Sequence, residues 1–150
     1  MKLFGGKSNQ PDETLQAPYL AMAFFCNDIT EDESGLKTFV QAIDTLSFNL
    51  KGDELLQSNV WKGKIALEIT FGDYKGPVDI SMIQTELATG DQETGLTHFI
   101  DTTDYPGMLA ITLTVDMTIA FKREGNYRYE FFLNKIKRGE TALRVRSVRS

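Results

Sequence analysis

The sequence predicts an all-β fold: a single-domain antiparallel β-sandwich, or a partly open barrel, of about seven strands with at most one or two short helical turns. Three observations support this prediction. Segments with alternating apolar and polar residues recur along the chain, as half-buried strands require. Turn-forming glycine, asparagine and aspartate residues separate these segments. The length of 150 residues suits one domain with an adequate core.

The first 16 residues contain glycines and polar residues but little apolar content. We expect a flexible leader at 1–16 and a sandwich domain at 17–150. Gly5 and Gly6 stand where a secretory signal needs an apolar stretch, and the apolar run from Tyr19 to Cys26 is too short for a membrane helix. Cys26 is the single cysteine, so no internal disulfide forms. We therefore expect a cytoplasmic protein without membrane association.

The apolar run ends in an acidic stretch, CNDITEDESG, at residues 26–35. A calcium loop of the EF-hand type needs glycine at its sixth position and glutamate at its twelfth. A loop starting at Asp28 has Glu33 and Phe39 there instead. We interpret the stretch as a solvated turn that ends at Gly35.

The next segments differ in the type of structure that their residues favour. Residues 36–48 are rich in β-branched and aromatic residues and are interpreted as a strand, although the spacing of Leu36, Phe39, Val40 and Ile43 also allows a helix. Residues 52–59 fit one short helical turn. The polar residues 89–97 fit a loop, and the alternation at 142–148 predicts a strand.

Two hairpins are predicted from alternating segments on either side of a turn. The first joins residues 64–71 to 78–82 through GDYKGP, and the second joins 109–121 to 127–131 through KREGN. Gly125 or Asn126 supplies the positive φ that a short hairpin loop needs. The segment 109–121 gives the clearest strand signal, because seven alternate positions in it are apolar.

Charge is distributed unevenly along the chain. Residues 121–150 hold 9 Lys/Arg and 3 Asp/Glu, whereas residues 1–120 hold 7 and 18. Such a pattern indicates either a basic arm or basic late strands within the folded domain, and we favour the strands. The net charge of −5 argues against general nucleic-acid binding. The residues expected on a basic interaction surface are Arg128, Lys137, Arg144 and Arg146.

Catalytic and metal-binding patterns are weak. One cysteine and one histidine cannot form a Cys/His zinc site, and the sequence contains neither a G-x-S-x-G elbow nor a phosphate loop. We expect no enzyme activity, no cofactor and no metal. Loop carboxylates provide an alternative, calcium or carbohydrate binding, although such residues also simply cap turns. The candidates are Asp28, Asp32, Asp73, Asp101 and Asp104.

One resemblance adds to this reading. The apolar strand ending in Cys26-Asn27-Asp28, the acidic turn, the following GLKTFVQAIDTLSF and the later Gly125-Asn126-Tyr127 resemble a group of small uncharacterised bacterial domains. The resemblance implies a β-sandwich of unknown function. It carries over no catalytic or binding residues.

The functional expectation follows from these patterns. We expect a non-enzymatic protein-interaction or assembly module, either a homo-oligomer or part of a larger assembly. The alternative is a ligand-binding sandwich that uses loops at residues 28–35, 72–76 and 101–107.

Overall fold

The computed structural model describes residues 18–104, 107 and 109–150, so the predicted leader at 1–16 lies outside the described residues. Nine strands and two 3₁₀ turns, η3 (Leu56–Ser58) and η4 (Thr102–Asp104), occur in this part of the chain. The strands are β1 (Tyr19–Glu31), β2 (Lys37–Ile43), β3 (Thr45–Leu50), β4 (Val60–Thr70), β5 (Pro77–Glu86), β6 (Gln92–Asp101), β7 (Ala110–Ala120), β8 (Gly125–Leu133) and β9 (Ile136–Arg149). No described helix is both long enough and apolar enough to cross a membrane.

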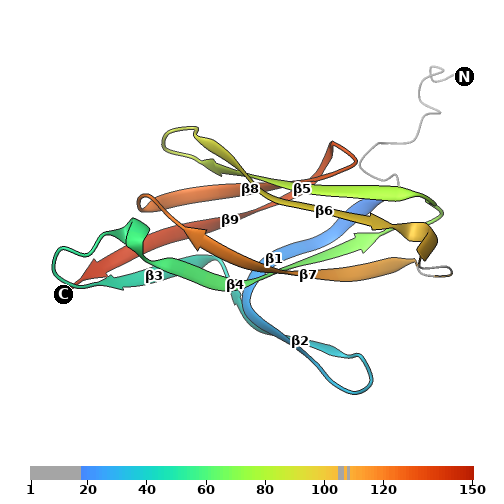
Figure 1. Ribbon diagram of the computed structural model, residues 1–150, viewed down its shortest axis with the longest axis horizontal. Coiled ribbons are helices and arrows are strands. Elements are labelled where there is room, and N and C mark those ends of the chain that lie inside the picture. Colours follow the sequence, from blue (N-terminus) through green and yellow to red (C-terminus); the bar gives the residue numbers. More distant parts are fainter. Residues whose placement is uncertain (1–17, 105–106, 108) are drawn as a thin grey trace, which may run out of the picture.

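The strands form two sheets that face each other (Figure 1). Sheet A has the order β2-β1-β4-β7, and sheet B has the order β3-β9-β8-β5-β6. The all-β sandwich is therefore confirmed, with more strands than expected. It is also not wholly antiparallel, because β3 pairs with β9 in parallel.

The core lies between the sheets and follows from the alternation of the strands. Sheet A contributes Phe25, Ile65, Leu67 and Ile69, and all four side chains are fully buried. Sheet B supplies the opposing layer of buried side chains, which includes Val78, Ile80, Met82, Tyr129, Phe131, Leu143 and Val145. Burial of these two layers holds the sheets together.

Both predicted hairpins are wrong. The segments at 64–71 and 78–82 belong to β4 and β5, and those at 109–121 and 127–131 belong to β7 and β8. In each case the first strand lies in sheet A and the second in sheet B. Each connection is therefore an arch between sheets. The first strand of each arch satisfies its backbone elsewhere, since β4 pairs with β1 and β7.

The structure also shows the secondary structure of three other segments. Residues 36–48 are extended, which excludes the helix, but they form β2 and β3 in different sheets, separated by Asp44. The expected loop at 89–97 lies largely in β6, which forms a sequential hairpin with β5, as β9 does with β8. The basic late segment 121–150 contains β8 and β9, and β9 pairs with both β3 and β8. The interpretation of this segment as a basic strand within the domain is confirmed.

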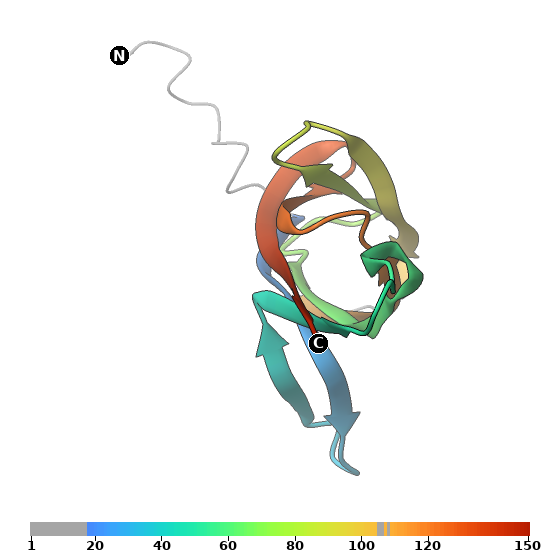
Figure 2. The same cartoon turned by 90° about the vertical axis from the view of Figure 1, so that its left-hand side faces the viewer.

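One hairpin extends beyond the sandwich. The first part of β1 pairs with β4 as far as Cys26, whereas the rest of β1 pairs only with β2. Figure 2 shows this hairpin leaving the body of the domain. We call residues 27–43 the arm.

Candidate functional site

The turn at the tip of the arm is held by Asp32. Its carboxylate accepts hydrogen bonds from the backbone N–H groups of Ser34 (2.9 Å) and Leu36 (3.0 Å) and from the Ser34 hydroxyl (2.6 Å). These donors hold the pKa of Asp32 below its ordinary value. Gly35 has a φ of 86°, which glycine adopts without strain. The arm therefore ends in an ordered turn.

The arm carries negative charge. Its exposed carboxylates belong to Asp28, Glu31, Asp32 and Glu33. Lys37 is the one basic residue of the arm. Its ammonium lies 3.9 Å from Glu31 and donates to the Thr112 carbonyl of β7 at 3.5 Å. The tip is therefore acidic, and Lys37 links the arm back to sheet A.

An apolar groove lies between the arm and the outer surface of sheet A. It encloses about 390 Å³, and its lining includes Met22, Leu36, Phe39 and Ile111. The ring of Phe39 meets that of Phe24 edge-on at 5.0 Å. Met22 remains 40% exposed and Leu36 68% exposed. A rimmed apolar patch of this kind is typical of a protein-contact surface.

The outer face of sheet B carries the predicted basic residues. Arg128 pairs opposite Ala142, and Arg144 pairs opposite Asn126. Directly paired residues share a face of the sheet, and so do residues two apart in a strand. The four predicted residues, Arg128, Lys137, Arg144 and Arg146, therefore lie on one face.

These four charges are not equivalent. Glu130 lies 2.9 Å from Lys137 and 3.6 Å from Arg128, so part of the positive charge is compensated. Arg144 and Arg146 are exposed and make no ion pair with any residue that the structure describes. We call the surface around these two arginines the basic face.

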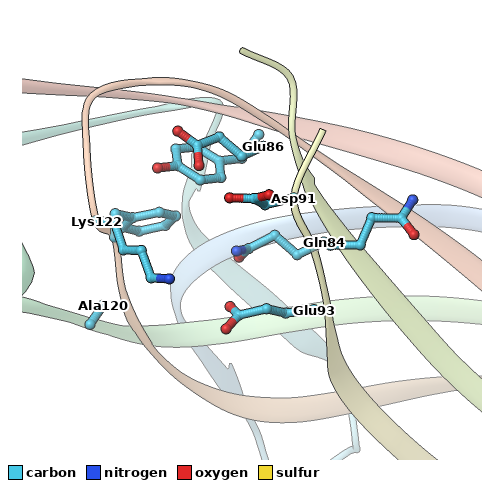
Figure 3. Close-up of a pocket in the computed structure, with 9 residues that line it drawn as sticks. Gln84, Glu86, Asp91, Glu93, Ala120 and Lys122 are labelled. Atoms are coloured by element: carbon cyan, nitrogen blue, oxygen red, sulfur yellow. The ribbon is translucent and has the colours of Figure 1, made fainter. Parts of the chain in front are cut away.

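A third site lies between β6 and β7, the strands that end sheets B and A. Two cavities, of about 290 and 230 Å³, share Gln84, Glu93 and Ala120 in their lining and form one groove. We call this groove the seam. Figure 3 shows Asp91 and Glu93 on one side of the larger cavity and Lys122 on the other.

Buried polar groups are paired at the end of the seam. The side chain of Glu86 is only 7% exposed and accepts a hydrogen bond from Arg123 Nε in an ion pair. That bond holds the pKa of Glu86 below its ordinary value. Tyr129 donates its hydroxyl to Gln84 Oε1 at 2.8 Å. Burial raises the pKa of Tyr129 far above its ordinary value.

The predicted loop carboxylates do not gather into one site. Asp28 and Asp32 lie on the arm, and Asp73 lies in the β4–β5 connection. Asp101 accepts from the Thr103 N–H (3.0 Å) and hydroxyl (2.7 Å), as a turn cap does, and Asp104 lies in η4. Among the described residues, no three His, Cys, Asp or Glu side chains lie together as metal ligands would. Calcium and carbohydrate binding remain untested predictions.

The seam contains residues that the sequence did not single out. Glu86 and Arg123 lie in segments of different type, and no motif connects them. Their contact results from the arch between β7 and β8, which was predicted as a hairpin. Cys26 is fully buried, and burial raises the pKa of its thiol.

Comparisons with known proteins add likenesses of fold. No family model matches the chain, and no curated protein matches it. Solved structures with a similar course include an alkylpurine DNA glycosylase of Pseudomonas fluorescens bound to DNA with an abasic site analog (6% identity, TM-score 0.45, covering 83% of this chain). This chain covers 30% of the glycosylase chain.

Two further structures are smaller. An immunoglobulin-like protein of Pseudomonas aeruginosa shares 13% identity at a TM-score of 0.42, covering 88% of this chain and 99% of that chain. The CARDB domain of a Pyrococcus furiosus protein, in complex with di-metal ions, shares 9% identity at a TM-score of 0.41, covering 91% of this chain and 99% of that chain. The strands and the buried core of this chain themselves identify it as an all-β sandwich domain.

Proposed function

We propose that this protein is a non-enzymatic assembly module in which the arm of one copy docks on the basic face of another. The observation that carries the proposal is the pairing of surface properties on one chain. The arm is acidic and bears the exposed Leu36, whereas the basic face bears Arg144 and Arg146 without ionic partners among the described residues. Opposite charges on two surfaces favour their encounter.

The two surfaces lie on different sheets, so the proposed contact is heterologous. The arm extends from sheet A, and the basic face lies on the outer side of sheet B. A contact between two different surfaces of the same chain repeats from copy to copy and yields a ring or an open chain.

Apolar contact supplies the second part of the proposed interface. Leu36 is 68% exposed beside the acidic tip, and Val148 is 53% exposed on β9 beside the arginines. Burial of both side chains contributes roughly 25 cal/mol for each Å² of apolar surface removed from water. Charge would thus steer the encounter and apolar burial would prolong the contact.

The test is the mass of the full chain in solution, measured by sedimentation velocity over a range of protein concentrations at low and high salt. We expect the mass to rise with concentration at low salt and to fall toward the monomer at high salt, because salt screens exposed charges. The variant R144E/R146E is expected to remain a monomer. The control K75E/K135E changes two exposed lysines in the β4–β5 and β8–β9 connections and should assemble normally. A strict monomer in all conditions would refute the proposal.

A further inference from the structure

We propose that the seam between β6 and β7 binds an extended peptide segment in which an apolar residue stands two positions from a lysine or arginine. This site is separate from the arm and the basic face. It does not depend on the assembly proposed above.

Two free sheet edges border the seam. Among the described strands, β6 pairs only with β5, and β7 pairs only with β4. One side of each strand therefore presents backbone N–H and C=O groups without a ladder partner. An extended peptide can add to such an edge and satisfy these groups by main-chain hydrogen bonds. The 11-residue β7 provides the longer of the two edges.

The two cavities lie one after the other along the end of β7 and the connection that follows it. The smaller one borders Met117 to Ala120, and the larger one borders Ala120 to Lys122. Their offset is thus about two residues, or roughly 7 Å in a strand. Alternate side chains of an added strand have the same spacing and point to the same side. The geometry fits one side chain in each cavity.

The smaller cavity has a mixed lining, in which Met82 and Met117 offer apolar contact and Gln84, Glu93, Thr94 and Thr118 are polar. Both methionines are buried, and Gly95 of β6 also lines the cavity. A Cβ at Gly95 would lie 2.6 Å from Met82 Cε. Because glycine has no side chain, the end of Met82 can occupy this space. Methionine adapts its shape to different apolar partners.

The larger cavity suits a cation. Three carboxylates line it, from Glu86, Asp91 and Glu93, against the single ammonium of Lys122. Arg123 pairs with Glu86 and lies 3.8 Å from Asp91. Glu93 makes no ion pair with a described residue. An incoming lysine or arginine would find a carboxylate there, whereas an acidic residue would be repelled.

The test is an amide NMR titration of the labelled full chain with the nine-residue peptide acetyl-TSTLTKTSG-amide. We expect saturable shifts at residues 91–95 and 117–122. Two control peptides replace the lysine by glutamate or carry N-methyl groups on the two threonines that flank the leucine. Each is expected to bind at least about tenfold more weakly, since a factor of ten corresponds to about 1.4 kcal/mol. The first control removes the charge contact and the second removes main-chain hydrogen bonds.

Protein variants complete the test. E93K is expected to weaken binding of the lysine peptide by about tenfold or more, whereas D53K, an exposed charge reversal in the β3–η3 connection, leaves it unchanged. R144E/R146E should also bind the peptide normally, which separates this site from assembly. Absence of shifts at the seam up to about 2 mM peptide, or equal binding of the glutamate peptide, would overturn the proposal.

Discussion

The ring of Phe25 in β1 meets the ring of Tyr129 in β8 edge-on, with centroids 4.7 Å apart and planes at 67°. Both side chains are fully buried, and they come from opposite sheets. Edge-on aromatic pairs contribute to stability beyond the burial of their apolar surface. Because Phe25 lies two residues before the arm, this contact anchors the arm to the core of the sandwich.

Truncation of Phe25 should destabilise the whole domain. F25A leaves a cavity between the sheets, and we expect a loss of about 3 to 5 kcal/mol in the free energy of unfolding, measured by urea denaturation. The control F99A removes a ring that is 58% exposed on β6 and should change stability by less than about 0.5 kcal/mol. Equal losses in the two variants would contradict the assignment of Phe25 to the core.

Gly63 should not tolerate a methyl group. A Cβ at Gly63 would lie 2.8 Å from the Cys26 carbonyl oxygen and would also meet the Trp61 ring. We expect G63A to lower the free energy of unfolding by about 1 to 3 kcal/mol through overpacking. Unfolding can be measured by the fluorescence of the single tryptophan. G95A is the matched control, because there the nearest atom is the flexible end of Met82. The prediction fails if G63A is no less stable than G95A.

Alkaline pH should reduce stability through the buried tyrosines. Burial raises the pKa of both Tyr127 and Tyr129 in the folded protein. Above about pH 10 the unfolded phenols ionise while the folded ones stay neutral, so the free energy of unfolding falls as pH rises. Urea denaturation between pH 8 and pH 11 measures this fall. Y129F should show a shallower decline, and an unchanged slope would refute the role of Tyr129.

Acid should remove the contribution of the Glu86–Arg123 pair. The folded pKa of Glu86 is lowered, chiefly by the hydrogen bond from Arg123. The stabilisation is therefore present above the unfolded pKa of about 4.3 and is lost as pH falls through the lowered folded value. R123Q should be less stable at pH 7 and should lose less stability between pH 5 and pH 2. R146Q is the control, and the same acid response in R123Q and the native chain would exclude the pair as its source.

Alternation along the chain predicted the strands well, because it depends only on which side chains face the core. In β7, the side chains of Ile111, Leu113 and Met117 pack in or against the core of the sandwich, as the pattern of 109–121 predicted. The same pattern could not distinguish a hairpin from an arch. A glycine-containing turn serves both, and the pairing of β7 with β4 depends on contacts distant in sequence.

Polar edge strands were the other source of error. Residues of β6 such as Glu93, Thr94 and Gly95 are exposed and so lack the apolar alternation that identifies a strand. The basic surface was predicted because β9 has both a strand pattern and arginines. The seam was not predicted, because it exists only where the edges of two different sheets come together.

The central claim is the docking of the arm on the basic face, and an exchange of charges tests it most directly. One variant, D28K/E31K/E33K, makes the arm basic and keeps the turn-capping Asp32, and the other, R144E/R146E, makes the basic face acidic. Each alone should sediment as a monomer, because like charges then oppose each other. An equimolar mixture should assemble again, since each variant then offers a complementary surface to the other. If the mixture remains monomeric under conditions in which the native chain assembles, the arm and the basic face are not partners.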